Sequence, residues 1–532
     1  MASHDLPHHF AIKLLTAEQG PYPLSAEARQ WICLTADGQL YLSESHKCAA
    51  PVLLFLEQLR RDQIRFTLQL VNLERIADLY TRWGPTNSQA IISYCQNQVA
   101  EIIQQAVMAK ASDLHIVVRE RATLIKFRVH GELLLTAECS REEGHTLCAT
   151  IYQTLCDVAE PVFNPHRSQD ARLMTSLLKI SELYGGRVAT RPTDSGLLMV
   201  IRLLYDRGSS TLQLDDLGYL PEQVERVNHM ASRRFGINIL SGPTGSGKST
   251  TLECLLKRII ARHHQKIHVL TLEDPPEYRI SGAVQTPIVC DKEDDEAVNR
   301  EWARAISNAM RLDPDILMCG EIRDSCSAIT TFRAAMTGHG VWTTLHANDA
   351  LAILTRLQDI GVSNSLLSDA SLITGLINQV LVKKLCRHCK QPYHPQHTTL
   401  PPDVQQRIER YCQVDQLFLR GPGCHHCQQR GIAGRMVVAE VIEPDNTLLE
   451  LFLSQGKNAA RQYWLNQLKG LSKNHNLITL INQGLIDPVD GEQDVCMLDH
   501  DALQAGKPDY TAGDLADPAS PATNVLTLST LS

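Results

Sequence analysis

Apolar and polar residues follow two different periods along the first 208 residues. In WICLTADGQLYLS (31–43) two apolar runs flank Asp37-Gly38, which is typical of a β-hairpin. From Ser88 onward the apolar positions recur every three or four residues, which predicts a helix. Four strand-like blocks then follow, at 114–118, 123–129, 186–190 and 197–204. We therefore predict a small mixed domain over 1–85 and an α+β domain over 86–208.

Beyond residue 208, short apolar blocks alternate with helical patterns, and this alternation predicts a parallel sheet covered by helices on both faces. The blocks lie at 237–241, 267–273, 315–319 and 340–346. They define an α/β core over 209–385. Two cysteine pairs follow within 386–435, then a helical region over 436–498. The remaining residues, 499–532, are rich in Pro, Ala, Thr, Ser and Asp and are predicted to be disordered.

Composition narrows the function classes. The chain has 532 residues and a net charge of −8, so no overall basic footprint favours nucleic acid. No apolar run approaches the roughly 18 residues that a membrane span requires. The first residues, MASHDLPHHF, also lack the basic-then-apolar order of a secretory signal. We expect a cytoplasmic protein.

A phosphate-binding loop is the strongest local signal. GPTGSGKS at 242–249 fits G-x-x-x-x-G-K-[ST] and lies between a predicted strand and a predicted helix. The spacing and the flanking elements argue against the alternative, a glycine-rich turn whose lysine points to solvent. Glycines let backbone N–H groups surround a phosphate, Lys248 should reach the β/γ-phosphates, and Ser249 should ligate Mg²⁺. The predicted nucleotide-binding set is Gly242, Pro243, Thr244, Gly245, Ser246, Gly247, Lys248, Ser249 and Thr250.

Acidic residues end the next two predicted strands of the core. LEDPPEY (272–278) offers Glu273, Asp274 and Glu277, and DILMCGEIRD (315–324) offers Glu321. Hydrolysis needs an acid that orients or deprotonates water. Taken alone, the acids of 272–278 would be a solvated turn, but their place after a phosphate-binding loop favours a functional role. Many P-loop enzymes have an aspartate where this chain has Gly320.

Two histidines bracket the fourth strand of the core, His339 before it and His346 at its end. Each alone is as well explained by a hydrogen-bonded core histidine. Together with the polar residues Thr343, Thr344 and Asn348, they could instead contact the γ-phosphate.

Two cysteine pairs, CRHC and CHHC, place Cys386, Cys389, Cys424 and Cys427 in a C-x₂-C…C-x₂-C pattern. Four thiolates are the usual shell of a structural Zn²⁺, and such a closed shell does not activate water. The gap between the pairs is longer than in most zinc ribbons, so the intervening segment should form a sizeable loop. A redox C-x-x-C pair is less consistent with this context. His388, His425 and His426 are possible substitute ligands.

These motifs occur in an order that resembles the secretion ATPases of type II secretion and type IV pilus assembly. The resemblance runs from about Ser112 to about Glu443. It rests on SDLHI, KFRVHGEL, RVATRPT, the phosphate-binding loop, LTLEDPPEY, MRLDPDILMCGEIRD, TGHGVWTTLHANDA and the tetracysteine segment ending GIAGRMVVAEV. In this family the third strand characteristically ends in Gly-Glu, so Gly320-Glu321 fits the family pattern.

The resemblance implies a RecA-like P-loop ATPase core, preceded by a PAS-like α+β domain and followed by a Cys₄ zinc subdomain and a helical region. The implied cofactors are ATP, Mg²⁺ and Zn²⁺. It makes Glu277 the general base and gives Glu321 a part in the Mg²⁺ and water network. Further arginines are expected at the nucleotide by position in the family motifs: Arg187 and Arg202 from the α+β domain, with Arg311 and Arg435.

The family further implies a homo-hexamer in the cytoplasm, held peripherally at the inner membrane by a platform protein. The cysteine-containing members are associated with assembly or secretion, so we expect a motor that extends a pilus or pseudopilus. A nucleic-acid-translocating P-loop motor is the alternative, and the acidic balance argues against it. A nucleotide-gated scaffold without turnover is a third class, and the presence of Glu277 and Glu321 argues against that.

Overall fold

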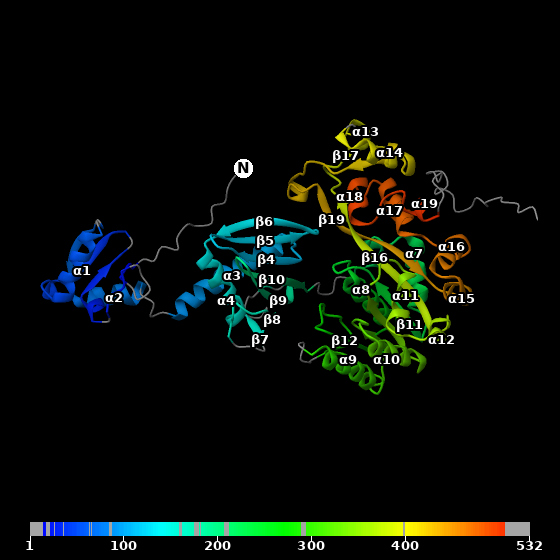
Figure 1. Cartoon of the computed structure of the whole chain (residues 1–532), viewed down its shortest axis with the longest axis horizontal. Helices are drawn as coiled ribbons and strands as arrows, with labels where there is room; N and C mark the ends of the chain where they lie inside the picture. Colours follow the sequence, from blue (N-terminus) through cyan, green and yellow to red (C-terminus); the bar gives the residue numbers. More distant parts are fainter. Residues whose placement is uncertain are drawn as a thin grey trace, which may run out of the picture.

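A computed structural model describes residues 14–16, 22–25, 27–35, 37–62, 64, 66–83, 88–158, 162–174, 180, 182–206, 212–288, 294–396 and 399–505. Figure 1 shows three bodies in chain order along the long axis of the molecule. None of the helices within the described ranges combines the length and the apolar character that crossing a membrane requires.

The first body is a three-stranded sheet with a helix on each face. Apolar side chains of successive strand residues point to opposite faces, so one set packs under α1 and the other under α2. The predicted hairpin is confirmed as the antiparallel pair β1–β2, and β3 runs parallel to β2 at the edge. The elements are η1 (Ala28–Gln30), β1 (Ile32–Leu34), β2 (Gln39–Ser43), η2 (Glu44–His46), α1 (Ala50–Arg61), β3 (Thr67–Val71) and α2 (Leu73–Trp83).

The second body is an antiparallel seven-stranded sheet in the order β6-β5-β4-β10-β9-β8-β7, and helices α3 and α4 pack with it in one core. The four predicted strands are present, and β6, β7 and β8 add to them. The elements are α3 (Ser88–Met108), β4 (Asp113–Val118), β5 (Thr123–Val129), β6 (Glu132–Cys139), α4 (Arg141–Thr154), β7 (Cys156–Val158), β8 (Gln169–Leu173), β9 (Leu183–Thr193) and β10 (Gly196–Tyr205).

The third body contains the core sheet, ordered β13-β12-β14-β15-β11-β16-β19, in which only β19 is antiparallel to its neighbour. Buried clusters lie on both faces, as predicted for strands that alternate with helices. The elements up to β16 are α6 (Leu214–Leu217), α7 (Pro221–Met230), β11 (Gly236–Ser241), α8 (Lys248–Arg262), β12 (Val269–Glu273), β13 (Ala283–Pro287), α9 (Asp295–Ala309), β14 (Ile316–Cys319), α10 (Ser325–Met336), β15 (Gly340–Leu345), α11 (Ala352–Asp359), α12 (Asn364–Leu367) and β16 (Ile373–Leu385).

The tetracysteine segment leaves the core after β16 and returns as β19 (Ile432–Ile442), which pairs with β16 along its length. The sequence places residues 432–435 in the zinc subdomain and 436–442 in the helical region. In the structure both stretches belong to the core sheet, because the apolar run MVVAEVI pairs and buries as a strand. The elements between are β17 (Gln391–Pro392), α13 (Tyr393–Gln396), α14 (Pro402–Tyr411), η4 (Val414–Gln416), β18 (Phe418–Leu419) and η5 (His425–Cys427).

After β19, the described part of the chain contains five short helices, which pack against the core sheet and the tetracysteine subdomain. They are α15 (Asn446–Gln455), α16 (Lys457–Asn466), α17 (Lys473–Asn482), α18 (Pro488–Asp494) and α19 (His500–Ala505). The disordered tail predicted from residue 499 is therefore helical over its first residues, where Asp501 pairs with Arg461. The rest of the tail, 506–532, lies outside the described residues.

Candidate nucleotide and metal sites

The phosphate-binding loop lies between β11 and α8, at the carboxyl edge of the core sheet. Gly242, Gly245 and Gly247 all have positive φ angles, of 144°, 79° and 86°. A Cβ on Gly242 would lie 2.2 Å from the backbone oxygen of Gln379, so this position has no space for a side chain. Ser246 is buried, and its Oγ has no hydrogen-bond partner. The loop therefore presents the backbone conformation and the unpaired polar group that a phosphate would use.

Lys248 is the first residue of α8, and its side chain folds back across the loop. Its Nζ donates to the backbone oxygens of Gly242, at 2.7 Å, and Pro243, at 3.2 Å. Burial lowers the pKa of Lys248, while the nearby carboxylates of Glu321 and Glu277 raise it. The ammonium group of Lys248 therefore interacts electrostatically with Glu277 and Glu321, the two acids predicted from the sequence. The remaining predicted loop residues, Thr244, Ser249 and Thr250, lie in the same turn or the first turn of α8.

Glu321 follows β14 and lies beside the end of β15. Its Oε1 is 3.3 Å from Nε2 of His346, and its Oε2 accepts a hydrogen bond from Arg323 at 2.9 Å. Gly320 is packed tightly before it, because a Cβ there would lie 3.0 Å from the backbone oxygen of Leu272 and 3.2 Å from the Trp302 ring. A side chain at this position would therefore require its neighbours to shift by a few tenths of an ångström, and the acid follows one residue later.

The acids of 272–278 differ in their surroundings. Glu273 is buried and accepts hydrogen bonds from Thr271, at 2.6 Å, and Gln285, at 3.0 Å; burial raises its pKa. Glu277 has a more exposed carboxylate, which lies 3.9 Å from a guanidinium nitrogen of Arg202. Glu273 thus holds the local structure, and Glu277 is the acid available to a bound molecule.

Arg202 joins the α+β domain to this edge of the core. Its Nε donates to Asp113 at 3.2 Å, and its other end approaches Glu277. Arg187 lies directly opposite Arg202 in the β9–β10 register and is exposed. Burial lowers the pKa of Arg435 on β19, while the carboxylate of Asp113 raises it. Arg435 is therefore near Asp113, the residue that also accepts a hydrogen bond from Arg202. Three of the four predicted arginines therefore gather around the contact between the α+β domain and the core.

His339 and Arg311 lie elsewhere. His339 precedes β15, so it is at the amino edge of the sheet, and the six residues of the strand, about 20 Å in length, separate it from His346. Its Nδ1 lies 2.9 Å from the backbone oxygen of Ala334 and 3.0 Å from Oγ1 of Thr337. Arg311 is exposed in the loop before β14, at this same amino edge. Neither residue is brought to the phosphate-binding loop of its own chain.

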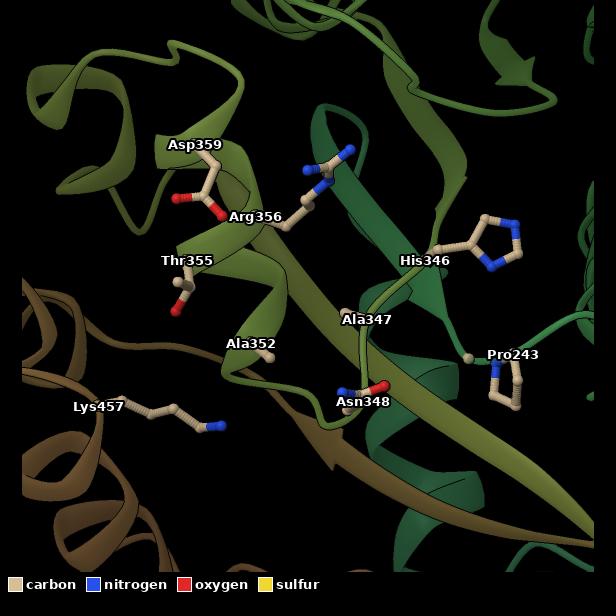
Figure 2. A pocket seen from close by; sticks show the side chains of 10 residues that line it. Pro243, His346, Ala347, Asn348, Ala352, Thr355, Arg356, Asp359 and Lys457 are labelled. Atoms are coloured by element: carbon tan, nitrogen blue, oxygen red, sulfur yellow. The ribbon is translucent and has the colours of Figure 1, made fainter.

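A cavity of about 430 Å³ adjoins the loop on the side of α11. Figure 2 shows His346, Ala347 and Asn348 along one side of it, with Thr355, Arg356 and Asp359 on α11 and Lys457 from α16. Of the residues that line this cavity, Gly242, Pro243, His346 and Asn348 were picked out from the sequence, and those on α11 and α16 were not. The helix α11 offers no motif, and Lys457 is more than a hundred residues further along the chain, so no local pattern links them.

The four predicted cysteines come together in one cluster. Their Sγ atoms all lie within 4.8 Å of one another, with separations of 3.8 Å for Cys386–Cys424, 3.8 Å for Cys389–Cys427 and 3.7 Å for Cys424–Cys427. Tetrahedral coordination with Zn–S bonds of 2.3 Å requires sulfur–sulfur separations of about 3.8 Å. Backbone N–H groups of Cys424 and Gly431 also donate to the Cys427 sulfur at 3.1 Å. The cluster therefore fits a thiolate-bound metal.

An ion pair connects this subdomain to the α+β domain. Arg420 donates to both carboxylate oxygens of Glu132, at 2.7 and 3.2 Å, and its Nε donates to the backbone oxygen of Arg430 at 2.9 Å. The Arg420 guanidinium lowers the pKa of Glu132. Two parallel hydrogen bonds fix the relative orientation of the two groups.

This combination of sheet order, phosphate-binding loop and strand-end acids defines the class of P-loop ATPases. The family described as type II/IV secretion system protein matches residues 88–486. The chain belongs to this family, and its core is a P-loop ATPase core.

Curated relatives agree with this assignment. The type II secretion system ATPase E of Vibrio cholerae is 34% identical over 364 residues, which cover 68% of this chain and 67% of that protein. The type II secretion system protein E of Klebsiella pneumoniae is 31% identical over 454 residues, covering 82% and 86%. The type IV pilus assembly ATPase PilB of Thermus thermophilus is 32% identical over 403 residues, covering 75% and 42%.

For several relatives the match spans about two thirds of their length, for example 65% of the type II secretion system protein E of Dickeya dadantii. Among solved structures, the ATPase DotB of Legionella pneumophila superposes with a TM-score of 0.51 at 20% identity, over 74% of this chain and 93% of that one. That likeness concerns the fold.

Proposed function

We propose that this chain hydrolyses ATP and that the hydrolysis drives extension of a type IV pilus or of a type II secretion pseudopilus. The observation that carries the proposal is the position of the phosphate-binding loop, Glu277 and Glu321 at one edge of the core sheet, where Arg202 lies 3.9 Å from Glu277 and His346 lies 3.3 Å from Glu321. The secretion and pilus ATPases among the relatives supply the biological context.

Each group has a defined part in the proposed reaction. The loop backbone and Lys248 bind the β- and γ-phosphates, and Glu277 accepts the proton of the attacking water. Arg202, with Arg187 beside it, offsets the negative charge that grows on the phosphoryl oxygens. Arg435 supports the same contact. Ser249 would ligate Mg²⁺, which neutralises phosphate charge when bound, and Glu321 with His346 orients water nearby.

We propose a homo-hexamer that lies in the cytoplasm and reaches the inner membrane through a platform protein. The family resemblance described under the sequence implies this assembly, and the contact between the α+β domain and the core at the nucleotide edge is consistent with it. The acidic net charge of −8 gives no support to the alternative, a nucleic-acid-translocating motor.

Cys386, Cys389, Cys424 and Cys427 are proposed to bind one Zn²⁺, whose contribution is to folding of the subdomain and not to the reaction. The sulfur separations support this. Elemental analysis of purified protein should give one zinc per chain, and Cys424→Ser should lose it. Stoichiometric iron, or no metal in protein purified under reducing conditions, would contradict the assignment.

The function is tested by phosphate release from ATP with the purified full chain, with and without single- or double-stranded DNA. Lys248→Ala should abolish release, because it removes the phosphate-facing charge, while the exposed-lysine control Lys266→Met should leave it unchanged. DNA-stimulated turnover would favour the nucleic-acid motor. Absence of turnover in assembled wild-type rings would overturn the proposal.

A further inference from the structure

The C-terminal helices carry no recognisable chemical motif, yet they contact the nucleotide edge of the core. Lys473 is the first residue of α17, where Ser472 caps the helix by accepting a hydrogen bond from the backbone N–H of His475 at 3.0 Å. The Lys473 side chain leaves the helix toward the loop 346–350, which joins β15 to α11. His346, the partner of Glu321, is the first residue of that loop.

Lys473 bonds directly to the loop and to the strand beneath it. Its Nζ donates to the backbone oxygen of Asn348 and to Oδ1 of Asn378, the latter at 2.8 Å. Asn378 is fully buried, and its Nδ2 donates to the backbone oxygen of Ala347 at 2.9 Å and to Oγ of Ser241 at 2.8 Å. Ser241 immediately precedes Gly242. One ammonium group therefore connects to the histidine loop and to the start of the phosphate-binding loop.

Glu440 on β19 reinforces the same loop. Its Oε2 accepts from the backbone N–H of Ala350 at 3.0 Å, while its Oε1 accepts from the backbone N–H of Lys473 at 3.3 Å. Arg461 approaches Glu440 at 3.4 Å, and the Glu440 residue is 2% exposed. A charge buried this deeply is stable only with such partners. It therefore fixes the beginning of α17 relative to the loop.

A further contact completes the support. Lys457, at the start of α16, forms an ion pair with Asp349. Figure 2 shows Lys457 extending from its helix on the side of the cavity opposite His346. Four consecutive loop residues, 347–350, thus bond to groups outside the loop, on β16, β19, α16 and α17.

We propose that Lys473 is a positioning residue for the nucleotide site, which holds the loop 346–350 so that His346 remains in contact with Glu321. This inference rests on the proposed function, since it concerns the turnover of that site. The network reaches the backbone of the residues that directly follow His346 and, through Asn378, the side chain of Ser241 before the phosphate-binding loop. Displacement of a supporting group by about 1 Å can lower turnover substantially.

The test is steady-state ATP hydrolysis by the full chain carrying Lys473→Met, which keeps the apolar stem and removes the donors. We expect kcat to fall about tenfold while KM for ATP changes less than about twofold, since ground-state phosphate binding is left intact. Lys473→Arg, which retains donors, should recover most of kcat. Lys266→Met, in an exposed loop, is the matched control and should match the wild type.

A double-mutant cycle with His346→Ala identifies the route. If Lys473 acts through His346, Lys473→Met should have less than about a twofold effect in the His346→Ala background. A full tenfold loss there would overturn the proposed route, and so would loss of ATP binding in parallel with kcat. Unchanged kcat in Lys473→Met beside an active wild type would overturn this inference alone, whereas an inactive wild type would overturn the proposed function.

Discussion

The two edges of the core sheet use similar residues for different purposes. At the carboxyl edge, Glu277 lies near Arg202 of the α+β domain, Glu321 lies near His346, and both carboxylates raise the pKa of Lys248. At the amino edge, His339 bonds within its own turn, and Arg311 points to solvent. In a parallel sheet the loops after the strands converge, and function gathers there. Proximity in sequence to a motif is therefore a weaker guide than the end of the strand on which a residue lies.

The largest effect should come from Glu277, the carboxyl-edge acid available to water. Glu277→Gln should reduce phosphate release at least about 100-fold, because an amide cannot accept the proton, while ATP binding is retained. Phosphate-release kinetics and equilibrium nucleotide binding measure the two effects separately.

Glu225→Gln, on the exposed side of α7, is the matched control and should behave as the wild type. Turnover at the wild-type rate in Glu277→Gln would remove Glu277 as the base and make Glu321 the next candidate. The catalytic role of the carboxyl edge of the core sheet would then depend on Glu321 and His346.

Local sequence pattern was sufficient to predict most of the core sheet. The strands β11, β12, β14 and β15 are short apolar blocks between helical stretches, and the phosphate-binding loop is a contiguous motif, so both could be predicted. The opposite positions of His339 and His346 could also have been predicted from the sequence. A six-residue strand between them places them at opposite edges, which the sequence interpretation did not use.

Other features depend on contacts between residues far apart in the chain. β19 joins the core sheet only after the tetracysteine excursion, so its apolar run was assigned to the zinc and helical regions. The bonds from Lys457 and Lys473 to the loop 346–350 cross more than a hundred residues. A lysine at the start of a helix has no local feature that distinguishes it from a solvated one. Such side-chain contacts require the folded structure.

His346 and His339 test whether a histidine at the carboxyl edge of the core sheet contributes more to turnover than one at the amino edge. His346→Ala removes the contact with Glu321 and should lower kcat about tenfold, the scale of a lost positioning or proton-transfer group. His339→Ala removes a bond within the turn after α10, so it should lower the free energy of unfolding by about 1 kcal/mol and kcat by less than twofold. Steady-state kinetics and thermal unfolding of both variants give the comparison. Equal losses of kcat would show that strand polarity does not separate their roles.

Arg311 should have the smallest effect, and it tests whether the amino edge belongs to another nucleotide site. Within one chain Arg311 is exposed and lies across the sheet from Lys248, so Arg311→Ala should change kcat by less than about twofold. Turnover should be measured over a range of protein concentrations, with the ring state followed by light scattering. Arg233→Ala, an exposed arginine before β11, is the matched control. A large loss of kcat in Arg311→Ala with the ring intact would contradict the expectation. Because the arginine cannot reach its own phosphate-binding loop, that loss would mean that it acts on the nucleotide of a neighbouring subunit.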